Sequence, residues 1–151
     1  IEKKKQYDGF FYPVINENAC ISCGFCLQVC HINKNKEQKT THNIYSAQAQ
    51  DDAVRNRGSS GGIFELLSKK IMGNGGVVYG AVFDHELRQV YHTSTDMIQL
   101  VNILRSKYVQ SDTKETFKEV GHALLNDRAV LYCGTPCQIY GLISYLKAKK
   151  K

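Results

Sequence analysis

The sequence of 151 residues contains no hydrophobic run long enough to cross a bilayer. Its longest apolar stretch covers residues 75–83, far short of the roughly 20 apolar residues that a membrane-spanning helix needs. The apolar segment of a signal peptide is also missing near the first residue. From these two absences we predict a soluble, cytoplasmic protein in a reducing compartment, with no membrane span.

The body of the chain also lacks a surplus of basic residues. The formal net charge is +6, from 20 Lys and Arg against 14 Asp and Glu. The excess lies at the two ends, in residues 2–5 and 147–151, and the 13 basic residues between them are balanced by 13 acidic ones. Because non-specific binding of nucleic acid depends on neutralising phosphates, we expect no nucleic-acid partner.

Cysteine, by contrast, is abundant and clustered. Four of the 6 cysteines are Cys20, Cys23, Cys26 and Cys30, and their C-x2-C-x2-C-x3-C spacing is typical of 4Fe–4S ligands. The first three thiolates can hold three corners of the cluster, while Gly24 lets the backbone turn toward the sulfurs. A structural zinc module is the weaker alternative, because a single knuckle of this kind does not close a tetrahedron.

The role of the fourth cysteine stays open. In two-cluster ferredoxins the last cysteine of such a run binds the other cluster. Either all four cysteines hold one cluster, or Cys30 belongs to a second cluster and the first three need a ligand from elsewhere. Since the chain begins with Ile1 rather than Met, we favour the second arrangement, with a companion motif upstream.

Beyond residue 60 the sequence has the periodicity of alternating helices and strands. We predict helices over residues 63–71, 97–104, 113–125 and 139–146, and strands over 77–83, 88–93, 107–110 and 129–133. Residues 32–60 are polar and predict an irregular connector. The predicted fold class is α/β, a mixed sheet with helices, preceded by a partial ferredoxin-like 4Fe–4S module.

The third predicted helix has two sequence signals. Asp112 and Glu115 have the spacing of a capping box that opens it. Its inward-facing residues are then expected to be Phe117, Val120, Leu124 and Leu125. For the second helix, Thr95 or Asp96 is placed to act as the N-cap.

A glycine-rich loop, Arg57-Gly58-Ser59-Ser60-Gly61-Gly62, leads directly into the first of these helices. Successive free amides at a helix N-terminus form a nest for an anion such as a phosphate. The alternative is an ordinary serine N-cap with permissive glycines. Neither the Gly-Lys-Ser/Thr of a P-loop nor a G-x-G-x-x-G register is present, so the loop does not indicate NTP hydrolysis or a standard dinucleotide fold.

A second loop, Gly134-Thr135-Pro136-Cys137-Gln138, follows a predicted strand and precedes a predicted helix. Sheets of the α/β class place ligands at the carboxyl ends of their strands. Pro136 suits a first helical turn, where Cys137 would feel the helix N-terminus, which favours thiolate. Cys137 therefore either faces a cofactor or simply packs, whereas Cys133 is expected to be a small buried residue.

Several segments together resemble the coenzyme F-420 hydrogenase/dehydrogenase beta-subunit family of iron–sulfur flavoproteins. Residues 8–13 (DGFFYP), ahead of the cysteine run, resemble the family's segment between two ferredoxin motifs. They are followed, in the family's order, by residues 59–64 (SSGGIF), 80–83 (GAVF), 106–111 (SKYVQS) and 134–138 (GTPCQ). The resemblance covers nearly the whole chain and implies that the chain is partial, because the family's first cysteine motif and most of its C-terminal domain are missing.

The resemblance implies domains and site residues. Residues 1–44 would be a partial ferredoxin-type domain with a connector, 45–112 a beta-subunit N-terminal-type domain, and 113–151 the truncated start of the C-terminal-type domain. Residues around an FAD would be Ser59, Ser60, Gly61, Gly62, Ser106, Tyr108, Gln110, Gly134, Thr135, Pro136 and Gln138. Lys107 and Cys137 would be catalytic, near the flavin ring or its substrate.

The function expected from this reading is an iron–sulfur, flavin-dependent oxidoreductase. Electrons would pass between the 4Fe–4S module and FAD, with a deazaflavin such as F-420, or another small molecule, as acceptor or donor. Relatives work beside hydrogenase, formate dehydrogenase or ferredoxin-like partners, and some bacterial members are associated with polysaccharide synthesis. The rivals are a non-catalytic 4Fe–4S electron carrier and a structural zinc module.

Overall fold

The computed structural model describes residues 1–30, 32 and 43–149. The chain divides into two compact units, Ile1–Lys34 and Asn35–Lys151. The predicted connector at residues 33–42 and the lysines at 150–151 lie outside the described residues.

The N-terminal unit is a hairpin followed by two short helices. Strands β1 (Glu2–Lys5) and β2 (Phe11–Val14) pair antiparallel, with Glu2 opposite Val14 and Lys5 opposite Phe11. The turn between them closes at Gly9, whose φ of 86° suits glycine. A 3-10 helix, η1 (Glu17–Ala19), ends directly before the cysteine run, and the helix α1 (Phe25–Val29) lies within the run and contains Cys26.

The C-terminal unit alternates helices and strands. Its elements are α2 (Asp52–Arg57), α3 (Ile63–Gly73), β3 (Val77–Phe83), β4 (Val90–Thr95), α4 (Leu100–Ile103), β5 (Ser111–Asp112), α5 (Thr116–Leu125), β6 (Val130–Tyr132) and α6 (Pro136–Lys149). The strands form one mixed sheet in the order β5-β4-β3-β6. β3 pairs antiparallel with β4 and parallel with β6, and β4 pairs parallel with β5. The prediction of a mixed α/β fold is confirmed.

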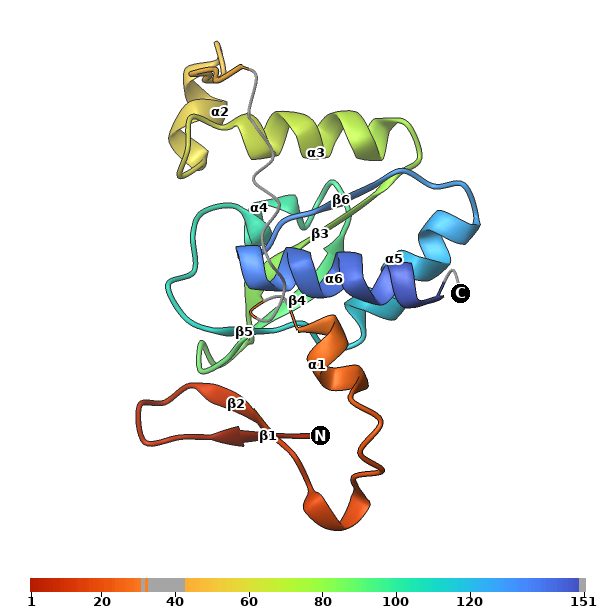
Figure 1. Cartoon of the computed structure of the whole chain (residues 1–151). Helices are drawn as coiled ribbons and strands as arrows, with labels where there is room; N and C mark the ends of the chain where they lie inside the picture. The colour runs from red at the N-terminus through yellow and green to blue at the C-terminus, as the bar shows by residue number, and fades with distance from the viewer. Residues whose placement is uncertain (31, 33–42, 150–151) are drawn as a thin grey trace. The chain divides into compact units, whose positions relative to one another are not determined.

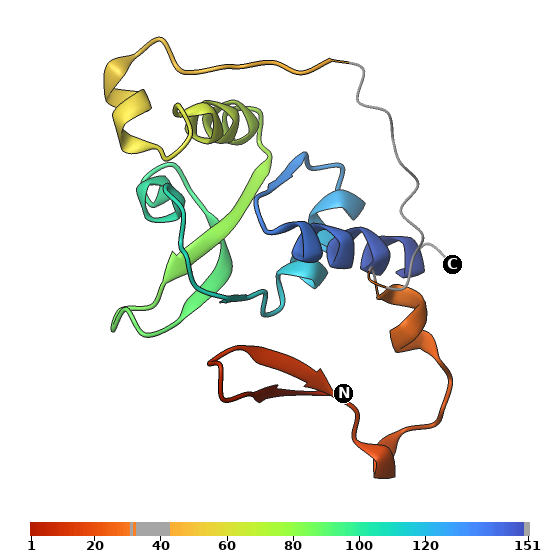
Figure 2. The same cartoon turned by 60° about the vertical axis from the view of Figure 1, so that its left-hand side comes forward.

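Helices cover both faces of this sheet, with α3 and α4 on one face and α5 and α6 on the other (Figures 1 and 2). The central strand β3 therefore contributes to two cores, as its continuous apolar sequence predicts. Val78 and Val82 pack with Ile103 on the first face, while Tyr79 packs with Val120 on the second. Gly80 allows close approach, since a Cβ there would lie 3.0 Å from the Ile103 side chain.

Several predicted elements differ from the observed ones. The second helix is a single turn, α4, and Asp96 accepts a hydrogen bond from the Gln99 amide just before it (2.7 Å). No strand forms over residues 107–110. The short strand β5 lies directly after them, at Ser111–Asp112. The predicted strand at 88–93 is confirmed but is shifted to Val90–Thr95.

The capping-box prediction is wrong. The carboxylate of Asp112 accepts a hydrogen bond from the Lys114 amide at 2.9 Å and thus closes a local turn. The helix begins only at Thr116, with Glu115 at the N-cap and no side-chain cap. Of the residues expected to face inward, Leu124 and Leu125 are exposed, because the buried face of α5 runs through Thr116, Val120 and Ala123 instead.

The connector prediction is also wrong where the structure describes residues 49–57. Ala49 and Val54 are buried, and α2 begins at an Asp51 side chain that caps the amides of Ala53 (2.7 Å) and Val54 (3.4 Å). This short helix stands directly before the glycine-rich loop. In the stretches of chain that the structure describes, no helix is both long and apolar enough to cross a membrane.

Candidate functional site

The four clustered cysteines are free thiols within the N-terminal unit. Cys20 and Cys23 are exposed, whereas Cys26 and Cys30 are half-buried. No group of three His, Cys, Asp or Glu side chains comes together in the described residues in a way that could hold a metal ion.

The backbone between these thiols turns twice through left-handed conformations. Ser22 has a φ of 53° and Gly24 a φ of 68°, and Gly24 is the N-cap from which α1 begins. Cys26 therefore lies in the first turn of α1. The residue type and the sequence spacing of the four thiols are those of iron–sulfur ligands, but the described side chains do not converge on one point.

A cavity of about 180 Å³ in the C-terminal unit brings together segments that are far apart in the sequence. Its lining residues are Gly58, Ser59, Ser60, Gly62, Phe64, Glu65, Ile103, Leu104, Arg105, Ser106 and Cys133. Of the residues expected around a flavin, four line this cavity: Ser59, Ser60, Gly62 and Ser106. The cavity therefore joins the glycine-rich loop to the start of the 106–111 segment and to the end of β6.

Hydrogen bonds tie these segments to one another. The Ser106 amide donates to Ser59 Oγ at 2.8 Å, and the Arg105 guanidinium donates to the carbonyls of Arg57 (3.1 Å) and Asn56 (3.3 Å). Ser59 thus makes a tertiary contact, and the alternative of an ordinary serine N-cap does not hold. The N-cap of α3 is Gly62, which makes no side-chain cap, so amides of the first turn have no acceptor within the helix.

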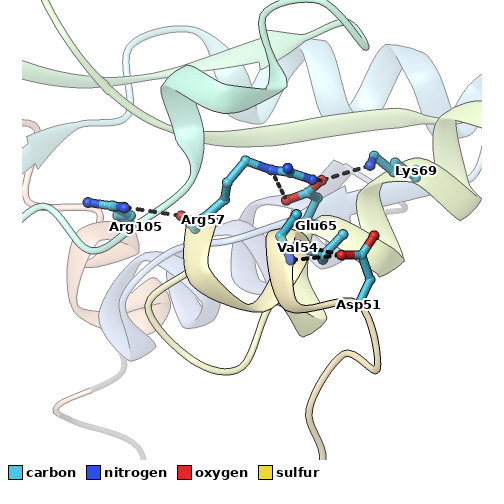
Figure 3. Close-up of polar contacts among 7 residues, drawn as sticks. Asp51, Val54, Arg57, Glu65, Lys69 and Arg105 are labelled. Atoms are coloured by element: carbon cyan, nitrogen blue, oxygen red, sulfur yellow. Dashed lines mark hydrogen bonds and ion pairs between the residues drawn. The ribbon is translucent and has the colours of Figure 1, made fainter.

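A buried carboxylate holds the loop between α2 and α3. Glu65 is only 3% exposed and accepts from Arg57 Nε (3.2 Å) and Nη2 (2.8 Å), while Lys69 Nζ lies 2.7 Å from Glu65 Oε1 (Figure 3). The bidentate bond from Arg57, assisted by Lys69, lowers the pKa of Glu65 against the opposing effect of burial. The ionised pair fixes the C-terminal end of α2 against the first turn of α3.

We expect Glu65→Gln to destabilise the fold by about 1–3 kcal/mol at neutral pH, because hydrogen bonds to a charged group are lost. A carboxyl whose pKa is lowered on folding stabilises fully above its unfolded value of about 4.3 and loses that contribution as the pH falls through the folded value. The difference between wild type and Glu65→Gln should therefore shrink below about pH 4 in urea unfolding. Glu86→Gln, at an exposed pair with Arg88, is the control and should stay within about 0.5 kcal/mol. A difference that is constant from pH 6 to pH 3 would contradict this account.

Lys107, one of the two predicted catalytic residues, is hydrogen-bonded to backbone carbonyls. Its ammonium donates to the carbonyls of Leu104 (2.6 Å), Asn102 (2.9 Å) and Arg105 (3.2 Å). Burial lowers the pKa of Lys107, and its interaction with Cys133 acts in the opposite direction. All three ammonium protons are thus engaged at the end of α4, where Lys107 acts as a C-terminal cap.

Cys133 faces the cavity, so the expectation that it is buried is wrong. Cys133 is exposed. Partial burial of its thiol raises the pKa of Cys133, and the Lys107 ammonium lowers it. Its backbone is held on both sides: the amide donates to the Tyr79 carbonyl at 3.0 Å and the carbonyl lies 3.0 Å from His92 Nε2. Strand β6 ends at Tyr132, and alternation along the chain places Cys133 on the same face as Leu131.

His92 supports this backbone from the other face of the sheet. It is 2% exposed and stacks on Tyr132 with centroids 5.2 Å apart. Because Nε2 meets a carbonyl, that nitrogen carries the proton, and burial lowers the pKa of the ring. Its Nδ1 has no partner among the residues that the structure describes. His92 is therefore a neutral packing histidine.

The Gly134–Gln138 loop is structured by its own side chains. The Thr135 amide donates to Gln138 Oε1 at 2.9 Å, and Gln138 Nε2 donates to Ser111 Oγ at 2.9 Å. Cys137 is exposed, with its sulfur 3.0 Å from Thr135 Oγ1. As predicted, Pro136 opens a helix, α6. None of these five residues lines the cavity.

Other predicted flavin residues lie outside the cavity as well. Tyr108 is 94% exposed, and Gln110 is not a lining residue. Gly61 belongs to the loop, but its carbonyl accepts from the Ala49 amide at 2.7 Å. No signal in the sequence identified Arg105, which lies next to the predicted segment 106–111, or the Arg57–Glu65 ion pair, whose partners are eight residues apart. Cys133 was predicted as a core residue and instead lines the cavity.

Comparison of the chain with models of known protein families, with curated proteins and with solved structures finds no match.

Proposed function

We propose that the chain is part of an iron–sulfur, flavin-dependent oxidoreductase that passes electrons between a 4Fe–4S module and FAD. The proposal extends to a small-molecule acceptor or donor of the deazaflavin type. Its sequence basis is the cysteine run together with the resemblance described above. When bound, a flavin supplies hydride and single-electron chemistry, and a 4Fe–4S cluster supplies single-electron transfer.

One observation carries the flavin half of the proposal. One cavity is lined by three segments: the glycine-rich loop, the chain around Ser106, and the end of β6. Ser59 and Ser106 are 47 residues apart in the sequence. Two of the three segments are ones that the resemblance assigns to flavin binding, and the third ends at Cys133, directly before the Gly134–Gln138 loop. Because two segments that the resemblance assigns to flavin binding meet at one cavity, the arrangement supports a common ligand.

The size and chemistry of the cavity suit one part of a flavin nucleotide. Sites for whole organic ligands usually measure about 300–1,000 Å³, whereas this cavity measures about 180 Å³. The residues that would hold a phosphate are Ser60, the first-turn amides of α3 and Arg105, whose guanidinium has N–H groups beyond the two used on carbonyls. Glu65 does not oppose an anion here, since its charge is balanced by Arg57 and Lys69.

The chain's own residues then have defined tasks. Ser59 and Arg105 hold the loop in place, Lys107 keeps the end of α4 closed, and the Cys133 thiol faces the cavity. In the N-terminal unit, Cys20, Cys23, Cys26 and Cys30 would supply the cluster's thiolates.

The flavin proposal is tested by equilibrium dialysis of the chain against FAD. Ser60→Asp places a carboxylate among the α3 amides and should weaken FAD binding about tenfold or more, because it repels a phosphate. Ser46→Asp, at an exposed position outside the cavity, adds the same charge and should leave binding unchanged. Absence of FAD binding, or equal weakening by both variants, would contradict the proposal and would favour a cluster-only electron carrier.

A further inference from the structure

The side chain of His92 connects β4 to the end of β6 across the strand that lies between them. β3 separates β4 from β6 in the sheet, and the residue of β3 opposite His92 is Ala81. Because the side chain of Ala81 is small, the imidazole ring has room to cross β3, and its Nε2 lies 3.0 Å from the Cys133 carbonyl oxygen. The last paired residue of β6 is Tyr132, so this bond holds the peptide group that follows the ladder.

The bond acts on the wall of the cavity. Cys133 lines the cavity, whereas His92 is not a lining residue. The Cys133 amide is held by the Tyr79 carbonyl at 3.0 Å, and its carbonyl is held by His92. With the peptide groups on both sides held, φ and ψ of Cys133 are fixed, and with them the place of the thiol and the path of the chain into Gly134. Any effect of His92 on a ligand of the cavity therefore passes through Cys133.

The ring that makes this bond is buried and uses only one of its two nitrogens. His92 is 2% exposed, and its Nδ1 has no hydrogen-bond partner in the part of the chain that the structure describes. In the neutral ring Nδ1 is an acceptor, whereas in the protonated ring both nitrogens are donors. Protonation would thus bury a charge together with an N–H group that lacks an acceptor, which costs more than an unused acceptor does.

The groups around the ring are neutral apart from one carboxylate. β3 contributes Ala81, and Tyr132 of β6 stacks on the ring. Tyr132 Oη lies 3.0 Å from the Thr116 hydroxyl, which donates to a carbonyl of its own turn. Burial lowers the pKa of His92, while its bond to the carbonyl and the carboxylate of Asp112, on β5, act in the opposite direction. The neutral form of the ring is the one that fits these surroundings.

We propose that His92 is a positioning residue for the cavity: its neutral ring holds the Cys133 carbonyl and so the cavity wall, and a solvent proton on Nδ1 releases both. The protonated ring turns toward water to hydrate Nδ1, which breaks the bond to Cys133 and frees the start of the Gly134–Gln138 loop. Because the unfolded value of histidine is about 6.5 and the folded value lies below it, the held wall is fully stable above this pH and is lost as the pH falls below it. The choice of FAD as the ligand rests on the proposed function, whereas the contact between His92 and Cys133 does not.

The test measures the FAD affinity of the full chain by equilibrium dialysis at about pH 7.5 and about pH 5. The wild-type affinity should fall about three- to tenfold at the lower pH, because the protonated fraction has lost its cavity wall. His92→Gln offers an amide N–H in place of Nε2–H and does not titrate, so its affinity should be close to that of the wild type at neutral pH and should fall little on acidification. His85→Gln makes the same change at an exposed histidine and should keep the full pH dependence.

A third variant separates the hydrogen bond from the stacking. His92→Phe keeps a ring to stack on Tyr132 but cannot donate to the Cys133 carbonyl. Its affinity for FAD at neutral pH should be about as weak as that of the wild type at pH 5, roughly three- to tenfold reduced, and should not change with pH. If His92→Phe does not fold, the comparison between His92→Gln and His85→Gln is sufficient.

A second readout does not require FAD. Alkylation of the chain with iodoacetamide, followed by mass spectrometry, gives the rate at Cys133 relative to Cys137, an exposed thiol that does not line the cavity. This ratio removes the general effect of pH on thiolate formation. It should rise about twofold or more at pH 5 in the wild type, because the released wall exposes the thiol, and it should stay constant in His92→Gln.

Three results would overturn the inference: a wild-type affinity that is equal at the two pH values, a fall in affinity that persists in His92→Gln, or an alkylation ratio that does not change with pH in the wild type. Absence of FAD binding at neutral pH would contradict the flavin proposal instead. In that case the alkylation ratio alone decides whether His92 positions Cys133.

Discussion

Anaerobic incubation with iron and sulfide is expected to load iron and acid-labile sulfide onto the chain, and the loading should depend on Cys20, Cys23 and Cys26. Replacing any one of the three by serine removes a soft thiolate corner ligand, which a hydroxyl does not replace at neutral pH. We therefore expect each variant to lose most of its bound iron and its visible absorbance. All four thiols of the run are free in the structure, and none has to be released from a disulfide.

Two further variants sharpen this experiment. Cys137→Ser changes an exposed thiol outside the run and should keep the full iron content. Cys30→Ser should also keep it if Cys30 serves a second cluster, as we favour, and should lose it if all four cysteines hold one cluster. Zinc without iron or sulfide would contradict the cluster and establish the structural alternative.

The most accurate predictions from the sequence were for elements that are buried on two faces, because burial on both faces requires a continuous run of apolar residues. The run Val77–Phe83 was predicted as a buried strand, and it is one because Val78 and Tyr79 enter different cores. Helix α2 was missed because Val54 is its single buried residue, so it has no apolar period to detect. The capping box failed because Asp112 prefers a two-residue contact with Lys114, a local competition that spacing alone does not resolve.

The candidate site was predictable as separate segments but not as an assembly. The loop at Ser59–Gly62 and the segment that begins at Ser106 were both identified, yet the hydrogen bond that joins them spans 47 positions. The role of Lys107 also depends on three carbonyls around the end of α4, which no motif encodes.

Gly62→Ala should be among the most damaging single substitutions in the C-terminal unit. Gly62 is the N-cap of α3 and has a φ of 76°, a conformation that costs other residues about 1–2 kcal/mol. A Cβ at this position would also lie 2.8 Å from the Val54 carbonyl oxygen and 2.9 Å from Val54 Cγ1. Because Val54 belongs to α2 and is buried, the clash can be relieved only by moving α2 away from α3. We expect a loss of about 2–4 kcal/mol in the free energy of unfolding.

Gly75→Ala is the matched control for this loss. Gly75 has the same φ of 76°, but a Cβ there would meet nothing within 4 Å, so it should cost only the conformational part, about 1–2 kcal/mol. Urea unfolding of both variants measures the difference, which isolates the crowding between α2 and α3. That crowding also shapes the cavity, since Gly62 lines it; FAD binding should therefore weaken in Gly62→Ala and persist in Gly75→Ala at temperatures where both are folded. Equal losses of stability in the two variants would show that the contact between Gly62 and Val54 is not tight in solution.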